Sequence, residues 1–235
     1  MQYSLLGKMF NQIFPGSCAI CEQTLLGGEE AVCSDCFLTL PVTNTWTHPY
    51  DNEMAKIFWH LIPLERCCSL FYYHSHAPSS QLLYRLKYGQ EPDLGYRLGR
   101  LIAQKGKEIQ FFEGIDGIIP IPLSSARLRC RGYNQSLMIA EGIASATNIP
   151  ILHDVVKRTS FTESQTHKNK WQRNENVEHV FELTDAYPVA RLVGKHLLLV
   201  DDVCTTGATI VSCCKTLMSL GGMKFSVATV GWAHA

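Results

Sequence analysis

Residues 197–209 read LLLVDDVCTTGAT, an apolar strand that ends in two carboxylates and is followed by a Thr-Thr-Gly turn opening a helix. The first amides of a helix lack intrahelical partners, and a glycine lets the backbone approach a ligand closely, so such a turn can cradle a phosphate. Hydroxyl groups of Thr205, Thr206 and Thr209 add donors. A sugar on that phosphate would lie over the strand end, where Asp201 and Asp202 could accept hydrogen bonds worth roughly 1.5–3 kcal/mol each.

Two other interpretations of this segment are weaker. A Walker B strand also ends in acids, but it needs a Walker A loop, in which a glycine-lysine pair is followed by Ser or Thr. The pairs Gly7-Lys8, Gly106-Lys107 and Gly194-Lys195 lack that hydroxyl residue. A strand whose last acid caps a helix by chance would not gather two acids, three hydroxyls and a glycine within nine residues.

Around this segment, strand-like and helix-like patterns alternate. Strands are predicted over 67–74, 116–122, 154–157, 179–183, 196–203 and 224–231. Helices are predicted over 51–62, from 78 through 86, over 94–102, over 134–147 with Asn134 as the cap, and over 207–220. Long apolar strands that alternate with helices predict an α/β fold, with a mainly parallel sheet that helices cover on both faces.

Composition narrows the class of protein further. The chain has 235 residues, 46% hydrophobic and 18% charged, which suits one globular domain with a small appendage and excludes disorder as the dominant state. Because 21 basic residues balance 21 acidic ones, any affinity for polyanions must come from local patches. No apolar stretch approaches the roughly 18 residues of a membrane span, and the first seventeen residues lack a signal-peptide pattern. We therefore expect a cytoplasmic protein.

Four of the ten cysteines form two closely spaced pairs, Cys18 with Cys21 and Cys33 with Cys36. Two such pairs can bring four thiolates to one tetrahedral centre. We expect a structural zinc ion because the set offers no open coordination position, and an iron–sulfur cluster is the alternative. The spacing predicts a zinc-binding module over 1–45, followed by a bridging segment over 46–76 and a main domain over 77–235.

Basic side chains crowd into two segments, at Arg127, Arg129 and Arg131 and again at Lys168, Lys170 and Arg173. They could serve the phosphates of a small ligand, a nucleic-acid backbone or an ordinary solvated surface. Tyr133 and Trp171 lie beside them and could stack on bases. The polar stretch over 159–176 is too long for an idle connection in a compact domain, so we expect it to act as an arm or lid over the site.

Residues 201–209 closely resemble the phosphoribosyl-pyrophosphate (PRPP) signature of type I phosphoribosyltransferases, and the whole chain resembles the ComF, or GntX-like, branch of that superfamily. Beyond the four cysteines, the shared motifs are LYRLKY at 83–88, IPIPL at 119–123, RGYNQ at 131–135, Arg158-Thr159, and Gln165 leading to Arg173 and Asn176. The 201–209 stretch is specific for the superfamily, and the combination of all these motifs is specific for the branch. The resemblance implies the type I phosphoribosyltransferase fold with an added zinc-ribbon-like module.

Carried over position by position, the resemblance implies that Asp201 and Asp202 hold the ribose hydroxyls, that 205–209 wrap the 5-phosphate, and that Lys87 and the 119–123 loop face pyrophosphate. Asp201, Asp202 and Lys87 are the implied catalytic residues. The full implied PRPP-binding set is Lys87, Pro120, Ile121, Arg131, Asp201, Asp202, Val203, Cys204, Thr205, Thr206, Gly207, Ala208 and Thr209. The resemblance also implies Mg²⁺, which we expect to arrive with PRPP because magnesium prefers substrate phosphates and water to an all-protein cage.

Three functions are consistent with this sequence. The first is a Mg²⁺-dependent phosphoribosyltransferase that displaces pyrophosphate from PRPP with a base or amine acceptor that the sequence does not identify. The second, implied by the association of ComF with natural competence, is a non-catalytic accessory protein in DNA uptake that binds PRPP and single-stranded DNA beside a competence helicase. The third is a sensor that binds PRPP without turnover.

Overall fold

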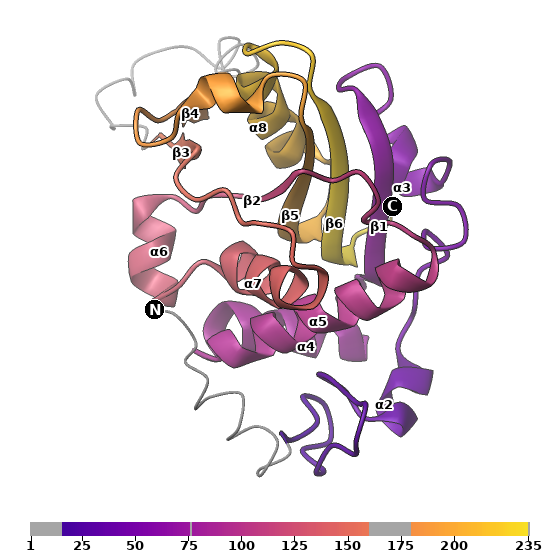
Figure 1. The fold of residues 1–235 in the computed structure, drawn as a ribbon. Helices are drawn as coiled ribbons and strands as arrows, with labels where there is room; N and C mark the ends of the chain where they lie inside the picture. The colour runs from indigo at the N-terminus through magenta and orange to yellow at the C-terminus, as the bar shows by residue number, and fades with distance from the viewer. Residues whose placement is uncertain (1–15, 76, 160–179, 235) are drawn as a thin grey trace, which may run out of the picture.

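The computed structural model describes residues 16–75, 77–159 and 180–234, and its centre is a four-stranded parallel sheet (Figure 1). The strands are β1 (Leu64–Tyr72), β2 (Gly117–Pro120), β5 (His196–Cys204) and β6 (Lys224–Trp232), in the spatial order β1-β6-β5-β2. A separate antiparallel pair is formed by β3 (Val156–Arg158) and β4 (Phe181–Leu183). Because the four central strands run in one direction, their carboxyl ends meet at one edge, where ligands of α/β proteins bind.

Helices cover both faces of the sheet. One face carries α4 (Pro78–Tyr88), α5 (Pro92–Glu108) and α7 (Gln135–Thr147), and the other carries α3 (Glu53–Lys56) and α8 (Ala208–Met218) (Figure 1). Alternate residues of β5 enter two different cores: Leu198 and Val200 pack on the first face, Leu197 and Leu199 on the second. The strand is continuously apolar because it is buried on both sides. The predicted α/β class and mainly parallel sheet are confirmed.

Helix α7 lies against α5 through two glycines. A methyl group at Gly99 would overlap the backbone carbonyl of Ile139, and one at Gly142 would overlap that of Tyr96. Glycine at both positions lets the two helix backbones touch. Their contact fixes the position of α7, which carries residues of the site described below.

Some predicted boundaries are wrong. The predicted helix over 51–62 is wrong, because only α3 is α-helical in this stretch. After Lys56 the backbone forms tighter turns, in which the amide of Phe58 donates to the carbonyl of Ala55, three residues earlier. His60 then adopts a φ of 62°. The tighter turns bury Phe58 completely. Three short elements were not predicted, namely α2 (Ser34–Thr39), α6 (Ser125–Arg131) and the 3-10 helix η3 (Val189–Leu192). Neither α2 nor α6 contains a buried residue, so no apolar periodicity marks them.

The segment over 46–76, predicted as a bridge, contains β1, which pairs along its length with β6. The domain sheet therefore begins inside that segment. The preceding stretch also packs on this strand, because Thr43 Oγ1 and Trp46 Nε1 both donate to the carbonyl of Ser69, the latter at 2.7 Å. Among the described residues, no helix combines the length and apolarity needed to traverse a bilayer.

Candidate functional site

Two adjacent carboxylates lie near the end of β5, at the carboxyl edge of the sheet. Asp201 Oδ1 accepts a hydrogen bond from Ser136 Oγ at 3.0 Å and another from the amide of Asp202 at 2.9 Å. Burial, together with the negative charge of Asp202, raises the pKa of Asp201 to about 7, and the hydrogen bonds offset this only in part. Asp201 therefore holds its proton to a higher pH than an ordinary aspartate does.

Two cations flank the neighbouring carboxylate. Lys87 Nζ lies 3.4 Å and Arg131 Nη1 lies 3.8 Å from Asp202 Oδ2. Lys87 belongs to the last turn of α4 and Arg131 is the last residue of α6, so distant segments converge on one side chain. The side chains of Asp202 and Arg131 are 12% and 13% exposed, which limits the screening of their attraction by water. The structure thus brings together Asp201, Asp202 and Lys87, the three predicted catalytic residues.

The turn after β5 is open to a ligand. Thr205 and Thr206 are exposed, Thr209 is partly exposed, and α8 begins at Ala208. Within the part of the chain that the structure describes, the amides of these four residues donate to no acceptor. Helix α8 has eleven residues, so its first amides carry the positive end of a full helix dipole. A turn with these unpaired amides can accept an anion.

Packing beneath this turn requires glycine. Gly207 has a φ of 73°, and a methyl group there would lie 2.8 Å from Ile57 and 2.9 Å from Phe58. The other two residues of the predicted set in this stretch contribute no reactive group: Val203 is half-buried, and burial raises the pKa of the Cys204 thiol to about 12. We expect Val203 and Cys204 to offer a ligand only backbone atoms.

The motif between α6 and α7 ties the pieces of the site together. Tyr133 Oη donates to the carbonyl of Leu86, the residue before Lys87. Asn134 caps α7 by accepting from the amide of Ser136 at 3.0 Å, and its Nδ2 donates to the carbonyl of Ile121 at 3.1 Å. Sequence reasoning missed Ser136, whose only signal is a hydroxyl two residues after the cap of a helix.

The loop after β2, predicted to face pyrophosphate, lies next to the acids. The amide of Ile121 donates to the carbonyl of Val200 at 2.9 Å, one residue before Asp201. The side chain of Ile121 is buried in the second core, whereas Pro120 is partly exposed. Ile121 can therefore offer a ligand only its backbone.

An aromatic pair and a basic helix border these residues. The rings of Tyr84 and Tyr88 on α4 lie 5.0 Å apart and are 67% and 58% exposed, and the Arg131 guanidinium lies 5.8 Å from the Tyr88 ring centre. Arg127 and Arg129 on α6 are exposed, and within the described ranges neither forms an ion pair.

A further arginine on β3 lies near the acids. Burial and the neighbouring Arg127 lower the pKa of Arg158, while attraction to Asp201 opposes that shift. The second predicted basic segment, with Lys168, Lys170, Trp171 and Arg173, falls outside the described residues, as does all of the predicted arm after Thr159.

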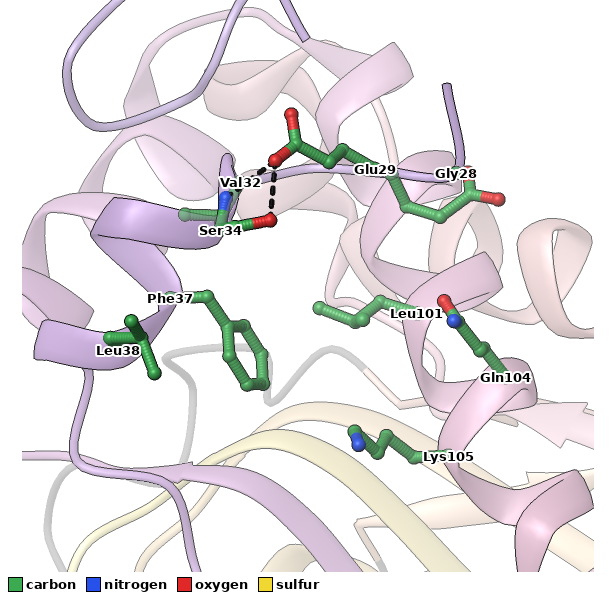
Figure 2. A pocket seen from close by; sticks show the side chains of 10 residues that line it. Gly28, Glu29, Val32, Ser34, Phe37, Leu38, Leu101, Gln104 and Lys105 are labelled. Carbon is green, nitrogen blue, oxygen red and sulfur yellow. Dashed lines mark hydrogen bonds between the residues drawn. The ribbon is translucent and has the colours of Figure 1, made fainter. Parts of the chain in front are cut away.

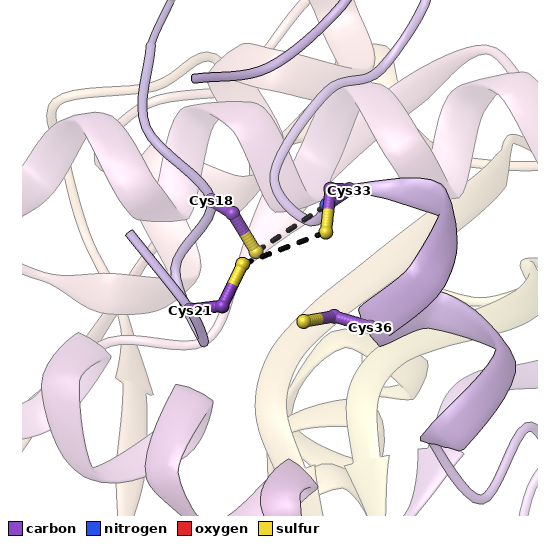
Figure 3. Close-up of side chains that lie close together, drawn as sticks. All are labelled: Cys18, Cys21, Cys33 and Cys36. Atoms are coloured by element: carbon purple, nitrogen blue, oxygen red, sulfur yellow. Dashed lines mark hydrogen bonds between the residues drawn. The ribbon is translucent and has the colours of Figure 1, made fainter. Parts of the chain in front are cut away.

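The four predicted metal ligands converge in the N-terminal module, as Figure 3 shows: the sulfurs of Cys18, Cys21, Cys33 and Cys36 lie within 4.8 Å of one another. The sulfurs of Cys21 and Cys33 are 3.6 Å apart. A tetrahedral ion with metal–sulfur bonds of about 2.3 Å needs sulfur–sulfur separations of about 3.8 Å. A cluster of several irons would spread the four sulfurs farther, so the group could hold a single metal ion.

Backbone amides lower the pKa of one of these thiols, that of Cys18. The amides of Ile20 and Cys33 each lie 3.4 Å from Cys18 Sγ. Burial alone would raise the pKa of Cys18, but hydrogen bonds from the backbone of Cys21, Cys33 and Ile20 lower it to about 6. The thiolate is the metal-binding form. Of the six cysteines outside the cluster, five are buried and only Cys130 is exposed.

Arginines of the main domain hold the metal module. Arg85 Nη1 on α4 donates to the carbonyl of Ala19 at 2.7 Å, and Arg100 Nε on α5 donates to both carboxylate oxygens of Glu30, at 2.9 and 2.8 Å. Buried apolar residues of the module share one core with α4, α5 and α7. The module is therefore packed as part of the domain.

A groove of about 290 Å³ separates the outer face of the module from α5 (Figure 2). Phe37, Leu38 and Leu101 form its apolar part, and Lys105 Nζ lies 5.9 Å from the centre of the Phe37 ring. None of the residues predicted to bind PRPP lines this groove. It is thus distinct from the pair of acids.

Replacing a single ligand should empty the metal site. We expect the Cys33→Ser chain to bind metal at least about tenfold more weakly than the wild type, because three thiolates and a hydroxyl cannot match four thiolates. Metal content per chain, measured by atomic emission, checks this. Cys130→Ser removes an exposed cysteine outside the cluster and should leave the metal content unchanged. Equal metal in both variants would contradict the assignment.

Asp201 should make the protein less stable as the pH rises. Its folded-state pKa is about 7 against an ordinary 3.8, so between these values the native state holds more protons and the free energy of unfolding falls with increasing pH. The free energy of unfolding of Asp201→Asn should therefore be higher than that of the wild type by at least about 1 kcal/mol at pH 8. This difference in stability should vanish near pH 4. Urea unfolding at both pH values measures it.

The matched control for this experiment is Asp116→Asn. Although burial opposes it, hydrogen bonds from His196 and Lys195 lower the pKa of Asp116, so its charge adds stability above pH 4. The control variant should lose stability at pH 8. An Asp201→Asn chain that also lost stability at pH 8 would show that the native carboxylate is stabilised.

The sequence has recognisable relatives. No protein-family model matches the chain. Competence protein F of Haemophilus influenzae is 31% identical over 160 residues, covering 66% of this chain and 68% of that protein. DNA utilization protein YhgH of Escherichia coli is 26% identical over 224 residues, covering 91% of this chain and 95% of that protein.

Among solved structures, a purine phosphoribosyltransferase of Pyrococcus horikoshii aligns with 57% of this chain and 81% of its own, at 16% identity and a TM-score of 0.36. The sequence relatives carry the assignment. This chain spans more than two thirds of competence protein F at 31% identity and nearly all of the Escherichia coli protein at 26%. The protein therefore belongs to the ComF family.

Proposed function

We propose that this protein is a PRPP-binding, Mg²⁺-dependent phosphoribosyltransferase of the ComF type, which displaces pyrophosphate from PRPP with a base or amine acceptor. The observation that supports it best is the meeting of Lys87 and Arg131 with Asp202, beside an exposed turn at the start of α8. PRPP carries phosphates at both ends of a dihydroxy sugar. A site for it needs anion-binding groups for two phosphate ends together with hydrogen-bond acceptors for the sugar, and the cations, the turn and the two acids are groups of these kinds.

Each group has a role in this proposal. The turn over 205–209 takes the 5-phosphate on its unpaired amides, and the two acids accept hydrogen bonds from the ribose hydroxyls. Lys87 and Arg131 exchange part of their contact with Asp202 for pyrophosphate oxygens, which carry more negative charge. The loop at Pro120 and Ile121 borders the same pyrophosphate.

The reaction asks the protein for positioning and charge. As the bond from the anomeric carbon to pyrophosphate breaks and one to the acceptor forms, the ribose ring becomes positive and the leaving group gains negative charge. The carboxylates of Asp201 and Asp202 beside the sugar would stabilise the positive charge on the ribose ring. Lys87 and Arg131 would stabilise the negative charge on the departing pyrophosphate. No side chain has to act as a nucleophile, because the acceptor nitrogen itself attacks the anomeric carbon and then loses its proton to water. Holding acceptor and sugar in line supplies much of the rate.

Magnesium fits this site as a companion of the substrate. The oxygens of Asp201 and Asp202 are hard donors of the type Mg²⁺ prefers. However, Asp202 already has two cationic neighbours, and the raised pKa of Asp201 reduces its charge, so the chain alone is a poor cage. When bound with PRPP, the ion would neutralise pyrophosphate oxygens. At the four cysteines we propose a structural zinc ion. A reducing cytoplasm would keep these thiols free of disulfides and available to the metal.

Calorimetric titration with PRPP and Mg²⁺ tests the proposal. Wild-type protein should bind with a stoichiometry of one, and Asp201→Asn/Asp202→Asn should bind at least about tenfold more weakly, because two charge-assisted hydrogen bonds are lost. Asp185→Asn, an exposed acid elsewhere on the chain, is the matched control. Unchanged affinity in the double variant would refute the role of the acids. Pyrophosphate release with a panel of bases and ammonia then separates an enzyme from a protein that only binds PRPP.

A second candidate is supported by α6 and by the tyrosine pair. Arg127 and Arg129 are exposed and lack ion-pair partners in the described chain. Arg131, on the same helix, lies 5.8 Å from the exposed Tyr88 ring, which pairs with Tyr84. Unpaired cations beside aromatic rings suit phosphates and bases of a single strand. Relatives are named for competence and DNA utilization. In this alternative the protein is a non-catalytic accessory in DNA uptake that binds PRPP and single-stranded DNA, with a competence helicase as partner.

Fluorescence anisotropy with a labelled single-stranded oligonucleotide tests this alternative. Arg127→Gln/Arg129→Gln should weaken binding and reduce the slope of log affinity against log salt by about 1.4, the share of two phosphate contacts on a single strand. Arg191→Gln/Lys215→Gln removes two exposed cations elsewhere and should leave the slope unchanged. An equal loss in both double variants would indicate non-specific attraction.

A further inference from the structure

Three consecutive residues at the end of α4 contact three different parts of the protein. Arg85 Nη1 donates to the carbonyl of Ala19 in the metal module at 2.7 Å. The carbonyl of Leu86 accepts from Tyr133 Oη. Lys87 Nζ lies 3.4 Å from Asp202 Oδ2. One helical turn, about 5.4 Å long, therefore joins the four-cysteine module to the pair of acids.

The contact of Arg85 with the module is specific. Ala19 lies between Cys18 and Cys21, so its carbonyl belongs to the turn that presents the first two thiols. The rest of the guanidinium is engaged as well: Nε and Nη2 donate to the two carboxylate oxygens of Glu91 at 2.9 and 2.7 Å. A planar fork held at three points cannot shift without breaking one of them. The orientation of Arg85 thus follows that of the cysteine turn.

The end of α4 needs such support. The helix stops at Tyr88, and its last backbone bond runs from the amide of Gly89 to the carbonyl of Arg85 at 2.7 Å. Helix ends fray unless they are tied down, and Lys87 lies within this last turn. On the inner side, Leu82 and Leu86 are fully buried in the same core as Cys18 and Cys33. The module therefore borders α4 through packing as well as through Arg85.

We propose that Arg85 is a positioning residue through which the four-cysteine module holds Lys87 at Asp202, so that metal binding and PRPP binding favour each other. The inference rests on the proposed PRPP site. A folded, metal-bound cysteine turn keeps the carbonyl of Ala19 in place, Arg85 follows it, and the ammonium group of Lys87 stays where pyrophosphate is expected. Coupling of this kind is reciprocal, so PRPP must strengthen metal binding by the same factor.

The first experiment uses the wild-type chain. The zinc affinity is measured by competition with a zinc-selective chelator, in Mg²⁺ alone and in Mg²⁺ with saturating PRPP. We expect PRPP to tighten zinc binding at least about fivefold, the lower end of ordinary coupling, and zinc-depleted protein to bind PRPP more weakly by the same factor. If PRPP binds but leaves the zinc affinity unchanged, the coupling is refuted. If PRPP does not bind at all, the proposed function fails and this inference with it.

Variants then locate the path. Arg85→Gln should weaken PRPP binding and abolish the effect of PRPP on zinc affinity. Arg100→Gln is the matched control, because Arg100 also holds the module, through Glu30, but from α5, away from the acids. It should lower zinc affinity modestly and retain the coupling factor. Arg85→Lys, which can still donate to Ala19, should restore part of the factor. Equal coupling in Arg85→Gln and Arg100→Gln would show that Arg85 has no special part.

Discussion

The attraction of Lys87 and Arg131 to Asp202 is the interaction on which the site depends. Strand β5, helix α4 and helix α6 bring one charge each, and the three meet at partly buried positions. Removing either cation would leave a poorly solvated carboxylate close to Asp201, whose own ionisation is already unfavourable. The cations therefore keep two neighbouring acids together at one edge of the sheet, and in the proposed function they already stand where pyrophosphate would bind.

Local features of the sequence predicted the centre of this arrangement. A strand buried on both faces must be apolar throughout, so 196–203 was visible as a strand, and the acids and glycine that follow it lie next to one another in the chain. The cysteine pairs are equally local. Such patterns can be recognised because the residues that act together are neighbours in sequence.

Features created by tertiary contacts could not be predicted in this way. Ser136 matters because α7, pressed against α5 through Gly99 and Gly142, carries it to Asp201. Helix α6 has no buried residue and so leaves no periodic signal. Strand β1 was recognised as a strand, but its pairing with β6 depends on a partner about 160 residues away in the chain. Phe58 ends the predicted helix over 51–62 early because its ring is needed in the second core.

The support beneath Gly207 has a consequence for the speed of recognition. The turn after β5 rests on Ile57 and Phe58, with no room for even a methyl group between them. Its conformation is therefore fixed by the core and does not have to be selected from many when an anion approaches. An anion bound there, as we propose, would cost the turn little chain entropy, and its capture would be governed by diffusion and long-range attraction, without a slow folding step at the loop.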